Sequence, residues 1–71
     1  MREKEILKKI RKVRIEENKT LKDMSKLLGY KSISTYGKKE LGLSPLTLKE
    51  YINICIILNK SLSFFFKRKL S

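Results

Sequence analysis

The chain lacks histidine and tryptophan, and it contains few cysteines, prolines, glycines and acidic residues. Its 71 residues include one Cys, one Pro, three Gly and no His. A single cysteine excludes an internal disulfide, and without histidine or a second cysteine the chain has no usual set of zinc ligands. The sequence also has no glycine-rich phosphate loop and no suitably placed pair of catalytic carboxylates. We therefore expect no enzyme activity, no cofactor and no metal site.

Long apolar runs are absent as well. No stretch approaches the ~18 apolar residues that a membrane span requires. The N-terminus opens with charged residues and lacks the apolar core of a signal peptide. We expect a cytoplasmic protein with no membrane partner. Cys55, which lies in "YINICIILN", is expected to be a buried small apolar residue.

Acidic residues are outnumbered by basic ones. Eighteen Lys and Arg stand against seven Asp and Glu, which gives a formal net charge of +11. Such a balance indicates a polyanionic partner, either nucleic acid or an anionic membrane surface. A lysine-rich surface without any partner is the alternative.

The length predicts a single domain over residues 1–71, and its apolar residues suffice for one small core. Apolar residues recur at helical spacing, and no β-type alternation persists. The first helix is expected over residues 3–17. The second begins at the N-cap Thr20 and stops at Gly29, and the third runs from the N-cap Ser32 to about Leu41.

Two further helices complete the prediction. Thr47 and Glu50 form a capping box that opens a fourth, very apolar helix ending at Leu58, which we expect at the centre of the fold. A short fifth helix is expected from Ser61 to about Lys67. The predicted fold class is therefore all-α, a compact bundle of about five short helices.

Residues 20–41 fit a helix-turn-helix, because two short helices meet through a turn that contains Gly29. In such a unit the second helix places its N-terminal half in the major groove of DNA. The segment "GYKSISTYGKKELG" supplies small hydroxyl residues and lysines for that purpose, while Tyr36 is expected to face the core. The residues expected to contact DNA are Thr20, Lys22, Lys31, Ser32, Ile33, Ser34, Thr35, Gly37, Lys38 and Lys39.

Individual members of this set have different expected roles. Ser32, as N-cap, leaves backbone N–H groups aimed at a phosphate. Ile33 suits a thymine methyl group, and the hydroxyls of Ser34 and Thr35 suit phosphates or base edges. Gly37 either permits close approach to DNA or another helix or is a simple spacer. Each lysine taken alone is either a phosphate contact or part of a solvated face.

The segments "IRKVRIEENKTLKDMSKLLG" and "STYGKKELG" resemble the Cro/repressor-type (Xre-like) helix-turn-helix family, and the resemblance extends from about Leu7 to Phe66. It implies a lambda-repressor-like fold, a DNA-binding function, and an ion pair between Arg14 and Glu40. The matching residues are Ile10, Arg11, Val13, Arg14, Thr20, Leu27, Leu28, Gly29, Ser34, Thr35, Tyr36, Glu40, Gly42, Ser61, Leu62, Phe65 and Phe66.

The sequence departs from the family pattern in three ways. Leu21 replaces a glutamine that contacts the DNA backbone, and Lys39 replaces an apolar residue. Residues 30–31 lengthen the turn by one residue. We expect either that Leu41 takes over the packing role of position 39 or that the third helix sits differently.

The sequence thus favours a sequence-specific transcriptional regulator that binds double-stranded DNA, most simply a repressor that occupies an operator with helix 32–41 in the major groove. An antitoxin that binds both DNA and a toxin is a variant of this reading. A cationic binder of membrane surfaces or RNA is the alternative. A homodimer would form through the last two helices, where an exposed phenylalanine lies beside Leu70. The sequence does not identify a toxin or an inducer.

Overall fold

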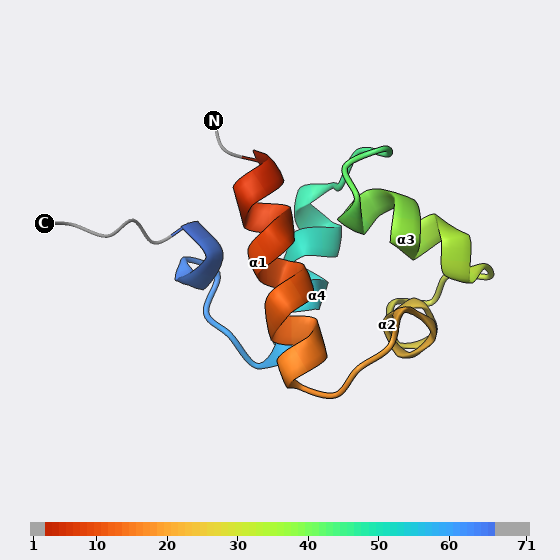
Figure 1. Cartoon of the computed structure of the whole chain (residues 1–71), viewed down its shortest axis with the longest axis horizontal. Helices are drawn as coiled ribbons and strands as arrows, with labels where there is room; N and C mark the ends of the chain where they lie inside the picture. The colour runs from red at the N-terminus through yellow and green to blue at the C-terminus, as the bar shows by residue number, and fades with distance from the viewer. Residues whose placement is uncertain (1–2, 67–71) are drawn as a thin grey trace, which may run out of the picture.

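The computed structural model describes residues 3–66, which form four α-helices and a final 3-10 turn (Figure 1). Within these residues no strand is present, so the all-α prediction is confirmed. None of the described helices is long and apolar enough to cross a membrane. The elements are α1 (Glu3–Glu16), α2 (Leu21–Leu28), α3 (Ile33–Glu40), α4 (Leu48–Leu58) and η1 (Phe64–Phe66).

Side-chain caps set the helix starts where the sequence places them. Thr20 and Thr47 each form a reciprocal capping box, with Asp23 and Glu50 respectively. Ser32 caps α3 by accepting a hydrogen bond from the Ser34 N–H. Such caps satisfy N–H groups that have no partner within the helix, and each contributes about 1 kcal/mol. The three short connections are therefore specified locally.

A single core lies where α1, α2, α3 and α4 meet. Tyr36 contributes the largest fully buried side chain and is 1% exposed, so its predicted core position is confirmed. Cys55 is buried among the apolar residues of α4, also as predicted. The apolar core consists of Leu7, Ile10, Val13, Met24, Tyr36, Tyr51, Ile54, Cys55, Leu58 and Phe65.

The predicted fifth helix is wrong. Only the three residues of η1 are helical there, as a 3-10 turn, and Lys67 and Leu70 lie outside the described residues. A segment this short gains too little from its own backbone hydrogen bonds to form a stable helix, so its docking decides its conformation. Tyr51 donates a hydrogen bond to the Leu62 carbonyl, and Phe65 packs edge-on against the Tyr51 ring at 6.2 Å between centroids. These contacts anchor the segment to α4.

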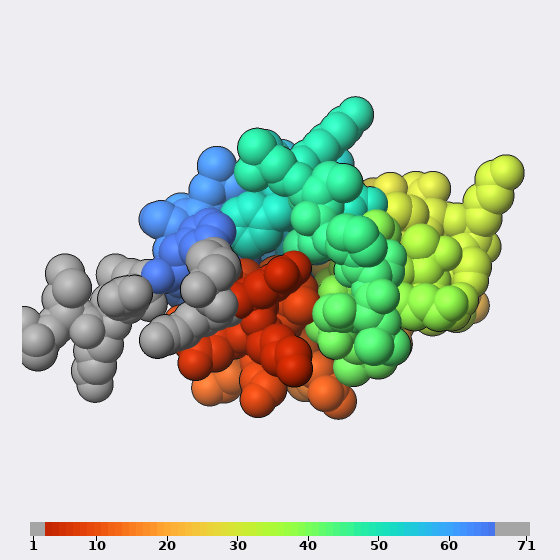
Figure 2. Space-filling model, turned by 90° about the horizontal axis from the view of Figure 1, so that it is seen from above, coloured from red at the N-terminus to blue at the C-terminus, as the bar shows by residue number. Residues whose placement is uncertain are grey.

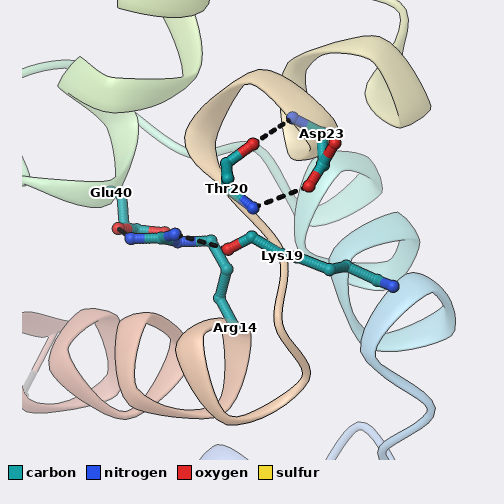
Figure 3. A network of polar contacts seen from close by, with 5 residues as sticks. All are labelled: Arg14, Lys19, Thr20, Asp23 and Glu40. Atoms are coloured by element: carbon teal, nitrogen blue, oxygen red, sulfur yellow. Dashed lines mark hydrogen bonds and ion pairs between the residues drawn. The ribbon is translucent and has the colours of Figure 1, made fainter.

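A buried ion pair joins α1 to α3. Arg14 Nε donates to Glu40 Oε2 at 2.9 Å, and Arg14 Nη2 donates to Glu40 Oε1 at 3.2 Å. The third donor, Arg14 Nη1, reaches the Lys19 carbonyl at 2.7 Å in the connection to α2 (Figure 3). The Arg14 and Glu40 side chains are only 9% and 4% exposed, so water competes little for these bonds. The pair expected from the family resemblance is present.

Replacing Arg14 with methionine should destabilise the fold by about 3–5 kcal/mol, because the Glu40 carboxylate would remain buried without its partner. For so small a domain this loss approaches the whole free energy of unfolding. Urea denaturation followed by circular dichroism measures it.

The matched control is Arg11→Met, which removes the same charge from an exposed position of α1. It should change the free energy of unfolding by less than about 0.5 kcal/mol. Equal stability of the two variants would contradict the structural role of the pair.

Candidate nucleic-acid interface

The outer side of α3 carries Ser34 and Lys38, and the C-cap residue Leu41 continues it. These residues are spaced by four and three positions, so they share one side of the helix, opposite the buried Tyr36 and Glu40. All three are exposed, and Leu41 is 65% exposed. In Figure 1, α3 lies across the view at the end of the molecule, while α2 is seen nearly end-on. Figure 2 shows the yellow and light-green atoms of this region at one end of the molecule, away from the blue C-terminal segment. This side of α3 is therefore accessible to a large partner.

Small hydroxyl side chains gather at the N-terminus of α3. Ser32 Oγ accepts from the Ser34 N–H at 3.2 Å and shares a hydrogen bond with Ser34 Oγ at 2.8 Å. Both serines are exposed, as are Lys31 before them and Thr35 after them. Ile33, in the first turn, is 46% exposed. The arrangement joins hydroxyl donors, a cation and the positive end of a helix dipole, which together suit a phosphate or a base edge.

The N-terminus of α2 is less favourable to phosphate than predicted. The Thr20 hydroxyl accepts from the Asp23 N–H at 3.0 Å, and the Thr20 N–H donates to the Asp23 carboxylate at 2.8 Å. That backbone N–H bond lowers the pKa of the Asp23 carboxyl below its usual value, so a negative charge stays at this end. The Thr20 hydroxyl keeps its proton to donate, and the exposed Lys22 supplies a cation.

Gly37 lies against α2 rather than on the outer side of α3. A Cβ built on Gly37 would have Leu21 Cδ1 as its nearest neighbour, at 3.8 Å. The contact supports the prediction that Gly37 permits close approach of another helix. It does not support a close approach of Gly37 to DNA. Leu21, in turn, is half-buried and packs toward α3 instead of reaching out to a phosphate.

Lys39 also departs from its predicted role as a phosphate contact. Its Nζ donates to the Pro45 carbonyl at 2.8 Å and to the Glu50 carboxylate at 3.2 Å. The side chain is only 14% exposed, because position 39 lies on the side of α3 that faces α4. Leu41 does not take over the packing role, since it is largely exposed. The lysine itself fills the position, with its charge neutralised by Glu50.

The Glu50 carboxylate is the acceptor for three donors. They are the Thr47 N–H at 2.8 Å, the Lys39 ammonium and the Tyr30 hydroxyl. Burial alone would raise the pKa of Glu50, but these hydrogen bonds outweigh it and lower the pKa to about 2. Burial and the nearby carboxylate raise the pKa of Tyr30, so the phenol keeps the proton that it donates.

The sequence analysis missed the exposed position of Leu41 beside Ser34 and Lys38, and it missed the group around Glu50. Leu41 follows Ser34 by seven residues and Lys38 by three, a helical spacing that was visible in the sequence. No sequence pattern indicated a contact among Tyr30, Lys39 and Glu50, because they lie in the turn after α2, in α3 and in α4.

Gly37→Ala should stabilise the fold by about 0.5–1 kcal/mol, because alanine favours the helical backbone and its Cβ meets only Leu21 at an ordinary contact distance. DNA affinity should stay unchanged, because the new methyl group faces α2. Thermal unfolding and a binding titration test the two parts.

The control is Gly29→Ala, where the space is open but φ is +82°. This left-handed conformation disfavours alanine, so a loss of about 1 kcal/mol is expected. A destabilising Gly37→Ala variant, or one that no longer binds DNA, would contradict the placement of Gly37.

Glu50→Gln should cost about 1–2 kcal/mol at pH 6, allowing for the partial exposure of the carboxylate. The folded-state pKa is about 2, against an ordinary value of 4.5. The stabilisation is therefore present above pH ~4.5 and lost as the pH falls toward 2. Urea unfolding of the wild type and the variant measures the difference in their free energies of unfolding. This difference should be smaller near pH 2 than at pH 6. The same difference at both values would refute this charge-dependent contribution.

Comparison with known proteins gave one match. A family model described as helix-turn-helix matches residues 10–65, which is more than half of the chain. No curated protein and no solved structure matches the chain. The matched range includes Arg14, Glu40 and the whole of α2 and α3. The family consists of DNA-binding transcription regulators with the lambda-repressor-like fold, whose members bind double-stranded DNA. The chain belongs to this Cro/C1-type, Xre-like helix-turn-helix family.

Proposed function

We propose that this protein is a sequence-specific repressor that acts by occupying its operator, with the N-terminal half of α3 in the major groove. The observation that carries the proposal is the exposed side of α3. Hydroxyl groups and Lys38 lie there, on a helix whose opposite side is fixed by the buried Glu40. A rigid helix with an exposed polar side can present the same groups to every binding site.

The polar residues of this side and Ile33 have separate roles in this proposal. Ser34 donates to a base edge, and Ile33 contacts a thymine methyl group. Ser32 and its neighbouring N–H groups, with Thr35, receive a phosphate at the positive end of the helix. Lys31 and Lys38 contact flanking phosphates. On α2, Lys22 and the Thr20 hydroxyl add a weaker second set of phosphate contacts.

Binding as a homodimer is part of the proposal. Leu62, Phe64 and Phe66 are 40–49% exposed at and before η1. In both views the blue C-terminal segment lies at the end away from α2 and α3 (Figures 1 and 2). A second copy seated there would leave both recognition helices free to bind half-sites ~34 Å apart. Such a regulator would work in the cytoplasm.

The test is selection of binding sites from a random duplex pool, followed by fluorescence anisotropy across a salt series. A short preferred motif is expected. Ser34→Ala should lower affinity for that motif about fivefold or more, with a smaller effect on random duplex. Lys38→Ala should weaken both and reduce the salt slope by about one.

Lys8→Ala is the matched control, because it removes one charge from an exposed position on α1. Its affinity for the selected motif should stay within about twofold of wild type. The proposal fails if no motif is selected, or if Lys8→Ala weakens binding as much as Lys38→Ala does.

A further inference from the structure

A second set of polar contacts holds α3, on a different side from the Arg14–Glu40 pair. Tyr30, Lys39 and Glu50, which we call the Glu50 junction, bring together the turn after α2, the end of α3 and the start of α4. The Lys39 ammonium also binds the Pro45 carbonyl and lies 5.9 Å from the centroid of the Tyr30 ring. Each member contacts both of the others, so the junction is closed.

The junction is partly shielded from water. The side chains of Lys39 and Glu50 are 14% and 20% exposed, and Tyr30 is half-buried. Ion pairs in such surroundings are stronger and more fixed in geometry than those on an open surface. The Lys39 ammonium has two oxygen acceptors and one aromatic face, so its position is well defined.

Lys39 and Glu40 are consecutive residues of α3 that bind in two directions. Successive side chains on an α-helix differ by about 100° around its axis. Glu40 binds α1 through Arg14, whereas Lys39 binds α4 through Glu50. Core packing of the buried Tyr36 already restrains α3, and the two polar attachments, in different directions, restrict its rotation further. The direction of Ser34 and Lys38 is fixed with it.

The junction also holds the turn that is one residue longer than usual in the family. Tyr30 follows Gly29 in that turn, and its hydroxyl donates a hydrogen bond to Glu50 of α4. This contact ties the start of the turn to α4, so the extra residue does not loosen the entry to α3. The junction therefore acts at both ends of the recognition helix.

We propose that Tyr30, Lys39 and Glu50 are positioning residues for DNA reading, which fix the rotation of α3 and thereby the discrimination between base sequences. This inference rests on the proposed function and adds residues that contact no DNA. Because the junction touches no phosphate, its loss should spare general attraction to DNA while reducing preference for the selected motif.

Two variants test the proposal without changing net charge. Tyr30→Phe removes one hydroxyl group, and the double variant Lys39→Met with Glu50→Gln removes one charge of each sign. The measured quantity is the ratio of affinities for the selected motif and for random duplex. We expect the ratio to fall about threefold or more in Tyr30→Phe and about tenfold in the double variant. Affinity for random duplex and the salt slope should stay near wild type.

Thr47→Ala is the control for a purely stabilising role. It removes the hydroxyl cap of α4, but it leaves the backbone N–H and the carboxylate of the junction in place. Thr47→Ala should lower the melting temperature about as much as the junction variants do, but it should keep the wild-type affinity ratio. An unchanged ratio in both junction variants, measured while they are folded, would overturn the proposal. So would an equal loss of affinity for random duplex.

A readout without DNA separates this proposal from the function on which it rests. If the wild-type protein selects no motif, the repressor proposal fails, and amide hydrogen exchange of Ile33–Glu40 then decides the junction's role. Faster exchange in both junction variants, but not in Thr47→Ala, would support positioning of α3. Exchange at the wild-type rate would overturn it.

Discussion

The buried pair between Arg14 and Glu40 is the interaction on which the arrangement of this domain depends. It crosses from the end of α1 to the end of α3, and Arg14 Nη1 donates a further hydrogen bond to the Lys19 carbonyl in the connection between α1 and α2. Such a pair contributes less to net stability than apolar packing of equal volume, because both charges lose their hydration. Its geometry is nevertheless strict, since a planar guanidinium satisfies a carboxylate in few orientations. The pair thus serves to specify where α3 lies.

In the proposed function, general attraction to DNA and reading of its sequence are divided between different groups of this protein. The charge of +11 supplies a general attraction to polyanions that weakens with salt. In the proposed function, reading falls to short hydroxyl side chains at the start of α3, which discriminate less sharply than arginine or glutamine. On α2, Leu21 packs toward α3 and Asp23 keeps a negative charge, so we propose that this helix adds little to DNA binding. Specificity in such a domain depends strongly on how rigidly α3 is held.

Much of the fold could be predicted from the sequence because local signals define it. Thr20, Ser32 and Thr47 cap helices through contacts within three residues, and Gly29 adopts the left-handed conformation expected at a helix end. The η1 segment could not be predicted, because its conformation depends on docking against Tyr51. Local propensity has little influence on so short a segment.

The candidate site was predictable only in part. Ser34 and Lys38 lie on the outer side of α3, where helical spacing puts them opposite Tyr36. Lys38 and Lys39 are both lysines, but they lie on different sides of α3. One step along a helix turns a side chain by about 100° around the helix axis. Its partner Glu50 lies eleven residues away, in another helix. Contacts of this kind require the tertiary fold.

NMR titration of the labelled protein with a short duplex tests directly whether the outer side of α3 contacts DNA. We expect the largest amide shift changes in residues 31–38, with smaller ones at residues 20–22. Changes centred on α1 or η1, with α3 unaffected, would contradict it.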